Sequence, residues 1–396
     1  MSDKLITSTA SASISAAYIH IPFCRRRCFY CDFPIYVVGN TMRGETSRTI
    51  SQYVEVLCQE ISTTPTNSSK SLKTVFFGGG TPSLLSTQQL QEILEILDGK
   101  FGIDKFAEIS MEIDPGTFDR QHLQGYANAG VNRISLGVQA FQENLLQYAG
   151  RYHSVSDIFA AVDLIFKSRI VNFSIDLISG LPHQTLLLWE ESLEQAIKIA
   201  PTHISIYDLT IEPGTAFGRY YKAGASPLPT DETTVKMYRM GQDILTSAGY
   251  KHYEISNYAK PGYQCHHNRV YWENRPYYGF GMGAASYVGG KRFTRPRKTK
   301  EYYAWVNGGS VIDTPATAPH EVLLETLMLG LRLAEGVDLQ ILREQFGENK
   351  IEEIVQILQP YLEKDWVKIR DQRLHLLDPD GFLFSNVVLA DLFEKL

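Results

Sequence analysis

Six short runs of β-branched and aromatic residues recur along the first 210 residues, and this repetition constrains the fold more than any other feature. Each run is followed by glycine or polar residues and then by a stretch with helical hydrophobic spacing. A strand, helix, strand order repeated six times predicts a parallel α/β sheet that curves into an open or closed barrel. The predicted strands cover residues 17–22, 74–77, 108–113, 133–138, 172–178 and 203–209.

One intervening stretch, residues 86–97, shows the helical pattern clearly. Leu90, Ile93 and Leu97 fall on one face, and Ser86 stands where it can cap the first turn. We therefore expect a helix here that buries its leucine face against the sheet.

Polar and ligand-binding residues stand at the ends of the predicted strands. In barrels of parallel strands, the carboxyl ends of the strands form the rim where ligands bind. The sequence therefore predicts that one rim collects a cysteine loop, a glycine turn and several acidic or amide groups. In chain order these are Cys24, residues 78–81, Glu112, Asp114, Gln139, Asp176 and Asp208.

The loop after the first strand carries Cys24, Cys28 and Cys31 in a C-x3-C-x2-C pattern. Three thiolates at this spacing can hold three irons of a four-iron cluster and leave the fourth iron to an exchangeable ligand. The alternatives are three unrelated thiols or a zinc site completed by His20. Structural zinc sites usually pair two cysteine units, and five cysteines supply no second pair. Cys58 lies in an amphipathic run and is expected to pack as a small hydrophobe.

Composition indicates an ordinary soluble protein of one major and one smaller domain. Of 396 residues, 44% are hydrophobic and 21% charged, enough to bury a large core. The net charge of -6 gives no electrostatic case for nucleic acid, and the arginines at residues 25–27 are expected to face an anionic ligand or an electron donor. The absence of a ~20-residue apolar run, of a signal-peptide pattern and of a disulfide framework predicts a cytoplasmic protein without its own membrane anchor.

Changes in the pattern divide the chain into four predicted segments. Proline, glycine, tyrosine and histidine are dense after the sixth strand, which favours an irregular, functional extension. Helical spacing resumes near residue 319, and two strands at residues 366–369 and 374–377 suggest a small α+β, winged-helix-like domain. The segments are a disordered tail at 1–14, the barrel at 15–210, the extension at 211–305 and the C-terminal domain at 306–396.

The cysteine spacing resembles that of the radical S-adenosylmethionine (SAM) superfamily, in which an aromatic residue often precedes the third cysteine, as Tyr30 does here. The resemblance implies a partial (β/α)6 TIM-like barrel that holds a [4Fe–4S] cluster. It also implies that the amine and carboxylate of SAM chelate the open iron, and that an electron can cleave the sulfonium to a 5′-deoxyadenosyl radical. By the same resemblance, Gly79, Gly80 and Thr81 receive the amino group of SAM.

Residues 110–115, 137–139 and 175–182, together with Arg151, are similar to the oxygen-independent coproporphyrinogen III oxidase family, and the likeness runs from residue 18 to residue 287. It implies that a set of polar residues surrounds the ribose and carboxylate of SAM and that two tyrosines flank the cluster loop and the adenine. These residues are Glu112, Gln139, Arg151, Asp176, Tyr18 and Tyr30. Carboxylates can bind ribose hydroxyls and a guanidinium can clamp a carboxylate. Taken one at a time, these residues have simpler explanations: Arg151 could form an ion pair with any surface acid, and Gln139 could hydrogen-bond to backbone groups between strands.

Two features separate this chain from the oxidases. Those enzymes carry a further cysteine two positions after the third, where this chain has Phe33. The segment at residues 265–272 contains H-N-x-x-Y-W, which is similar to the signature of the haem chaperone branch, HemW. A neutral imidazole is a good axial ligand for haem iron, and aromatic neighbours can pack on a porphyrin face.

By this likeness His267 binds haem, with His266, Cys265 and Tyr271 as competing ligands. The alternative is that His267 and its neighbours bond backbone groups and fill core.

The sequence and its resemblances together predict a haem-trafficking protein. It would accept haem and deliver it to acceptor haemoproteins, such as respiratory proteins, with the cluster, SAM and an electron donor assisting. The competing prediction is an oxidase that decarboxylates the propionates of coproporphyrinogen III by radical chemistry to give protoporphyrinogen IX. A weaker third is a radical methylase acting on an unrelated substrate.

Overall fold

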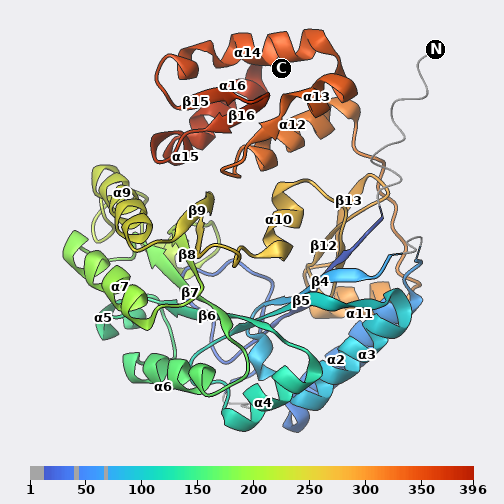
Figure 1. Cartoon of the computed structure of the whole chain (residues 1–396). Helices are drawn as coiled ribbons and strands as arrows, with labels where there is room; N and C mark the ends of the chain where they lie inside the picture. The colour runs from blue at the N-terminus through green and yellow to red at the C-terminus, as the bar shows by residue number, and fades with distance from the viewer. Residues whose placement is uncertain (1–12, 40–43, 67–69) are drawn as a thin grey trace.

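The computed structural model describes residues 13–39, 44–66 and 70–396. A large α/β domain holds a curved sheet with helices packed around its outer face, and a smaller C-terminal domain lies beyond one end of it (Figure 1). The sheet has nine strands in the order β11-β1-β4-β5-β6-β7-β8-β10-β9. This order has two free edges, so the barrel is open.

All six strands predicted from the sequence are present and pair in parallel, in chain order. Their side chains are buried on both faces, as expected for parallel strands covered by helices. They are β1 (Ala16–Ile21), β4 (Leu72–Gly79), β5 (Ile103–Ile113), β6 (Arg133–Gln139), β7 (Asn172–Ser179) and β8 (His203–Asp208). The carboxyl ends of all six therefore meet at one rim.

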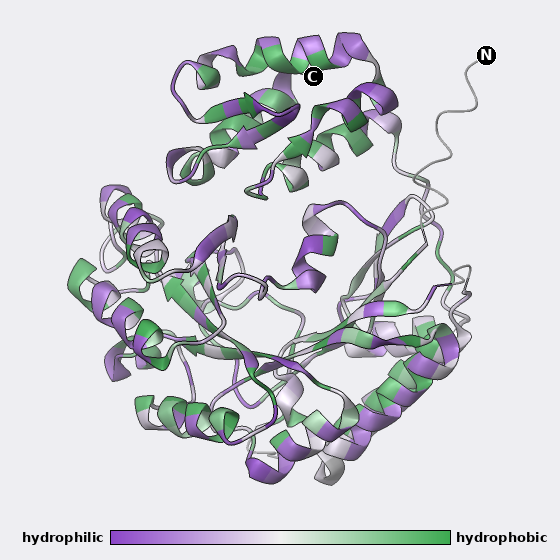
Figure 2. Ribbon diagram, viewed as in Figure 1, coloured by the Kyte–Doolittle hydropathy of each residue, from purple (hydrophilic) through white to green (hydrophobic). Residues whose placement is uncertain are grey.

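The helices between these strands turn their apolar faces to the sheet, as the green and purple sides in Figure 2 show. In α3 (Thr87–Phe101), Ser86 forms the predicted cap, strengthened by the side chain of Gln89, and the leucine face is buried. Cys58 is buried in α2 (Arg48–Thr63), which confirms its expected packing role. The other outer helices are α4 (Arg120–Ala129), α5 (Glu143–Tyr148), α6 (Val155–Phe166) and α7 (Leu186–Ile199).

The expectation of an irregular stretch at residues 211–305 is wrong for much of that segment. It holds the long helix α9 (Asp231–Ser247) and two pieces that extend the sheet. Strand β11 (Tyr278–Phe280) pairs in parallel with β1, and β10 (Asn257–Ala259) pairs antiparallel with β8. The remaining elements are α8 (Ala216–Tyr220), β9 (Lys251–Glu254), α10 (His266–Trp272), β12 (Ala285–Val288), β13 (Lys291–Thr294) and α11 (Thr299–Asn307).

A buried ion pair fastens this added sheet edge to the barrel. Glu60 of α2 is fully enclosed, and its Oε1 lies 2.8 Å from Nε of Arg295, which follows β13. Oε2 of the same carboxylate accepts the backbone N–H of Gly281 at 2.9 Å and the hydroxyl of Tyr302 at 2.7 Å. Both carboxylate oxygens are therefore satisfied by groups from three separate parts of the extension.

The C-terminal domain has its own apolar core and a three-stranded sheet in the order β14-β16-β15. The two strands predicted there are confirmed as β15 (Val367–Arg370) and β16 (Arg373–Leu376), an antiparallel pair. The other elements are α12 (Pro319–Gly330), β14 (Val337–Asp338), α13 (Leu339–Phe346), α14 (Glu348–Leu362), α15 (Asp380–Leu383) and α16 (Ser385–Lys395).

Backbone hydrogen bonds join this domain to the barrel at strand β9. The N–H of Ala334 donates to the carbonyl of Tyr253 at 3.0 Å, and the N–H of Ile255 donates to the carbonyl of Arg332 at 2.9 Å. Residues 1–12 of the predicted tail lie outside the described residues, whereas Ile14 packs in the main core. No helix in the described ranges is long and apolar enough to cross a bilayer.

Candidate cofactor site

A cavity of about 350 Å³ opens at the carboxyl-terminal rim of the parallel strands. Its walls come from the cysteine loop after β1, the glycine turn after β4 and the ends of β5, β6, β7 and β8. All predicted site residues except Tyr18 and His267 line it: Cys24, Cys28, Tyr30, Cys31, Gly79, Gly80, Thr81, Glu112, Gln139, Arg151 and Asp176. The structure thus brings together groups as far apart in the sequence as Cys24 and Asp176.

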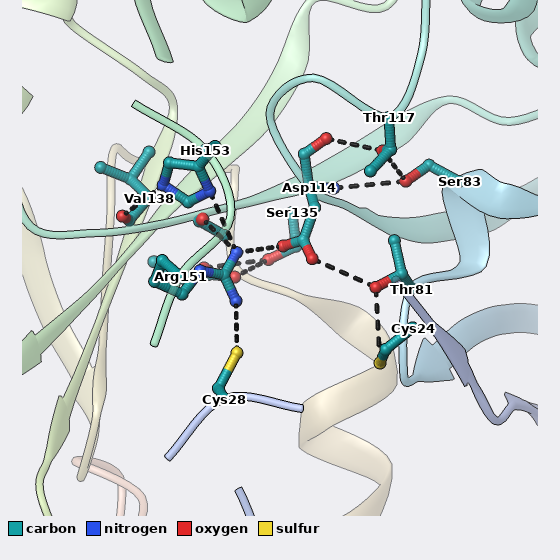
Figure 3. Close-up of polar contacts among 12 residues, drawn as sticks. Cys24, Cys28, Thr81, Ser83, Asp114, Thr117, Ser135, Val138, Arg151 and His153 are labelled. Carbon is teal, nitrogen blue, oxygen red and sulfur yellow. Dashed lines mark hydrogen bonds and ion pairs between the residues drawn. The ribbon is translucent and has the colours of Figure 1, made fainter. Parts of the chain in front are cut away.

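The three cysteines are free, half-buried thiols at the mouth of this cavity. Burial raises the pKa of Cys24 to about 12, although the hydroxyl of Thr81, 3.6 Å from its sulfur, acts in the opposite direction. Nη1 of Arg151 donates to the sulfur of Cys28 at 3.4 Å (Figure 3). Bound metal would have to displace protons from these thiols, and the donors beside them stabilise the thiolates that result.

Arg27 braces the loop and also lines the cavity, where the arginines at residues 25–27 are expected to face a ligand. Its guanidinium donates to the carbonyls of Cys31, Phe33 and Ile35 at 3.1, 3.2 and 3.3 Å. The loop is therefore held in shape by the chain itself. Arg26 remains exposed at the cavity mouth.

The surroundings of the thiols favour a cluster over a single zinc ion. Both ring nitrogens of His20 are already engaged, Nδ1 with the hydroxyl of Tyr18 at 3.0 Å and Nε2 with the carbonyl of Pro34 at 3.1 Å. Within the ranges that the structure describes, no three His, Cys, Asp or Glu side chains are arranged to hold one metal ion. With both nitrogens of His20 engaged, the zinc alternative lacks the fourth ligand that it was given, and three thiols at this spacing can each ligate a different iron.

The turn after β4 requires glycine because the backbone passes close to the cysteine loop. Gly79 has φ +112°, and a Cβ there would lie 2.5 Å from the ring of His20. A Cβ on Gly80 would lie 2.7 Å from the carbonyl oxygen of Phe23 and 3.0 Å from the sulfur of Cys24. Without side chains, the turn leaves backbone groups facing the cavity.

Two buried carboxyl groups, Glu112 and Asp176, face the cavity from β5 and β7. Burial, followed by the charge of Asp176, raises the pKa of Glu112 to about 8, while the N–H of Gly79 at 3.0 Å acts to lower it. Burial also raises the pKa of Asp176, against the hydroxyl of Ser135, which lies 2.7 and 2.9 Å from its two oxygens. A ligand that brings hydroxyl donors would find two acceptors with unsatisfied capacity here.

Asp114 joins the site in a role that the sequence did not assign. Its carboxylate forms an ion pair with Arg151 and accepts the hydroxyl of Thr81 at 3.1 Å (Figure 3). The partner of Arg151 is therefore a cavity acid and not an arbitrary surface group. The only signal in the sequence was its place at a strand end, two residues after Glu112.

Gln139 ends β6 in a strained conformation with φ +70°. The pairing of β6 with β7 shifts register between Gly137 and Gln139, and the shift turns the amide toward the cavity. A non-glycine residue held in this region of φ is uncommon and is often found at ligand sites.

Tyr30 lines the cavity, with its hydroxyl 3.5 Å from Nη1 of Arg151, but Tyr18 does not. The ring of Tyr18 lies within the sheet, stacked on Phe76 with centroids 6.2 Å apart. Its expected place beside the adenine is therefore not observed. Tyr18 packs behind the residues that line the cavity, and its hydroxyl contacts His20.

His267 lies in α10, at the opposite end of the barrel from the cysteine loop. Its side chain is fully buried; Nδ1 is 2.8 Å from the hydroxyl of Thr74, near the start of β4, and Nε2 is 2.8 Å from the hydroxyl of Tyr271. Burial lowers its pKa to about 3. In this conformation the expected ligand cannot reach a haem iron, since both nitrogens are occupied. Cys265 is also buried, whereas His266 is exposed.

Comparison with known proteins identifies the family. Residues 18–196 match the Radical SAM superfamily, and residues 318–384 match the HemN C-terminal domain. A protein from Synechocystis sp. named heme chaperone HemW is 48% identical, across 96% of this chain and 97% of that protein. Heme chaperone HemW of Bacillus subtilis is 34% identical, across 96% of this chain and 100% of its own length.

The solved structure of coproporphyrinogen III oxidase (HemN) from Escherichia coli shares the fold, with a TM-score of 0.83 across 98% of this chain and 92% of that chain, at 22% identity. The predicted radical SAM barrel with a separate C-terminal domain is thereby confirmed. The superfamily implies a [4Fe–4S] cluster and SAM, and the thiol loop and the cavity fit both groups. Because the relatives match nearly end to end, the chain belongs to the HemW family within the radical SAM superfamily.

Proposed function

We propose that this protein binds haem and transfers it to acceptor haemoproteins, in a reducing compartment such as the cytoplasm. The observation that carries the proposal is the end-to-end similarity to a relative named as a heme chaperone, at 48% identity. The chain's own residues support it. Phe33 stands where the oxidases have a fourth cysteine of the loop; it lines the cavity with half its surface exposed and can neither ligate iron nor relay protons.

The cavity supplies a distinct role for each wall. The thiols of Cys24, Cys28 and Cys31 would hold three irons, and a bound cluster supplies electrons together with one open iron for the amino acid part of SAM. The glycine turn would offer backbone groups to the SAM amine, and Arg151 would clamp its carboxylate. Exposed Arg26 at the mouth gives an electron donor a cationic approach.

Haem and coproporphyrinogen III titrations on the anaerobically reconstituted protein test the proposal directly. Haem should bind one to one and move to apomyoglobin, added as a general haem acceptor. Coproporphyrinogen III with SAM and a reductant should give no protoporphyrinogen. Release of carbon dioxide and protoporphyrinogen would instead establish the oxidase function, and absence of both haem binding and decarboxylation would exclude the two.

Substitution of the two adjacent histidines of α10 should separate haem ligation from packing. We expect His266→Ala to weaken haem binding at least about tenfold, because the exposed imidazole is the one that iron can reach, a loss of ~1.4 kcal/mol. His267→Ala should instead lower the free energy of unfolding by about 1–3 kcal/mol, since the hydroxyls of Thr74 and Tyr271 lose their buried partner. Haem spectra and denaturant unfolding are the two measurements.

The converse result would restore the sequence-based assignment. If His267→Ala abolished haem binding at unchanged stability while His266→Ala bound normally, His267 would be the ligand and α10 would have to open to expose it.

The affinity for 5′-deoxyadenosine should rise with pH up to about 8. This probe carries the ribose without the titratable amine of SAM. Because the pKa of Glu112 is raised to about 8, the carboxyl is protonated below that pH, and each unit below should weaken binding by up to about tenfold. Glu112→Gln should abolish this pH dependence of the affinity, whereas Glu191→Gln, on the surface of α7, should leave the pH dependence unchanged. A flat wild-type profile, measured by calorimetry, would contradict a role for ionised Glu112.

A further inference from the structure

A continuous chain of buried hydrogen bonds crosses the barrel from the cavity to α10. The hydroxyl of Ser174 donates to Oδ1 of Asp176 at 3.0 Å, and the oxygen of Ser174 lies 2.9 Å from Nδ1 of His203. Nε2 of His203 lies 2.9 Å from the hydroxyl of Tyr253, which accepts the backbone N–H of Cys265 at 3.2 Å. The four residues behind Asp176 are all at most 2% exposed. Asp176 is at the cavity, and Cys265 is the N-cap of α10.

The ionised carboxylate of Asp176 and a neutral His203 fix the proton order in this relay. The carboxylate can only accept, so Ser174 gives it its one proton and takes the proton of Nδ1 of His203; Nε2 of the neutral ring then accepts the hydroxyl of Tyr253, whose oxygen accepts the N–H of Cys265. Burial, followed by the charge of Arg133, lowers the pKa of His203 well below its usual value, which keeps the ring neutral with one proton, as this order requires.

At the far end of the relay, two side chains accept backbone N–H groups at the start of α10. The carboxylate of Glu108 accepts the N–H groups of His266 and His267 at 3.1 and 3.0 Å, and Tyr253 accepts that of Cys265. The carbonyl of Tyr253 also receives the N–H of Ala334 from the C-terminal domain. Tyr253 is therefore hydrogen-bonded to both the start of α10 and the C-terminal domain.

We propose that the relay couples occupancy of the cofactor cavity to the N-terminus of α10, with Ser174, His203 and Tyr253 as positioning residues. The inference rests on the proposed binding of SAM beside Asp176. A ribose hydroxyl that donates to Asp176 stabilises its ionised form, and an ionised carboxylate is the stronger terminal acceptor. Hydrogen bonds in series polarise one another, so each donor behind Asp176 is held more firmly. Because coupling is reciprocal, a ligand on α10 alters SAM affinity by the same factor.

Hydrogen exchange across residues 265–272 of the cluster-reconstituted protein, with and without SAM, tests the relay without reference to haem. We expect SAM to slow exchange of the first α10 amides by about fivefold, the lower end of measured couplings. Tyr253→Phe should abolish the slowing while SAM affinity changes less than about twofold. The matched control is Tyr250→Phe, which removes another buried tyrosine hydroxyl, bonded to the carbonyl of Pro201 at 2.8 Å, and should keep the slowing.

The outcomes separate the relay from the proposed function. If wild-type protein does not bind SAM, the assignment of the cavity fails and the coupling fails with it. If SAM binds but exchange in α10 is unchanged, the relay alone is wrong. Ser174→Ala breaks the same relay of hydrogen bonds next to Asp176. It replaces Tyr253→Phe in the experiment if that variant does not fold. Retention of the slowing in either folded variant would overturn the proposal.

Discussion

Replacing Cys24 with alanine should abolish the four-iron cluster. Each iron of such a cluster needs its own ligand, and the three thiols of the loop are the only cysteine sulfurs lining the cavity of the described chain. The expected iron content of the reconstituted variant is far below the roughly four per chain of a full cluster. Saturable SAM binding should be lost as well, because the open iron is absent. Iron and sulfide analysis together with the visible charge-transfer absorption measure the effect.

Cys58→Ala is the matched control for that experiment. Cys58 is buried in α2, away from the cavity, and its replacement should leave iron content and SAM binding unchanged. A modest loss of stability is expected from the smaller side chain. A Cys24→Ala variant that kept a complete cluster would refute the ligand assignment.

Arg295→Met should cause a large loss of stability, because it removes the cation of a buried ion pair. It leaves the carboxylate of Glu60 fully buried without its cation, and breaking such a pair costs about 3–5 kcal/mol. The two hydrogen bonds from Gly281 and Tyr302 remain but cannot neutralise the charge. Denaturant unfolding of the apo protein measures the free energy directly.

An exposed ion pair provides the comparison. Lys167 and Asp163 pair on the surface of α6 with more than half of each side chain exposed. Lys167→Met should therefore change the free energy of unfolding by less than about 1 kcal/mol. If Arg295→Met were equally mild, the added sheet edge would not depend on the buried pair.

The core strands were predictable because each is a short apolar run bounded by glycine or polar residues, and helices separate them. The short strands of the extension were not. Strand β11 has three residues and pairs with β1, which lies more than 250 positions earlier, so its partner leaves no local signal. Strands β9 and β10, of four and three residues, join the opposite edge of the sheet.

The cofactor rim could be predicted for the same reason as the strands. Residues at the ends of consecutive parallel strands must converge, and Glu112, Gln139 and Asp176 do so. The environment of His267 could not be predicted, because a motif does not state which surface its helix covers. Only the packing of α10 against the start of β4 supplies the hydroxyl of Thr74 and buries the imidazole. The role of Asp114 likewise depends on a partner, Arg151, from another strand connection.

Strand β1 carries the cysteine loop and lies between β4 on one side and β11 on the other. The hydroxyl of Tyr53 links β1 to the segment after β11, because it donates to the carbonyl of His20 and accepts the N–H of Met282. On the ribosome, the chain emerges from its amino end, so the cysteines appear long before β11 does. Their supporting strand gains its second neighbour only after residue 280 has been made. We therefore expect the loop to gain its complete support for iron and sulfide only after about 70% of this chain has been synthesised.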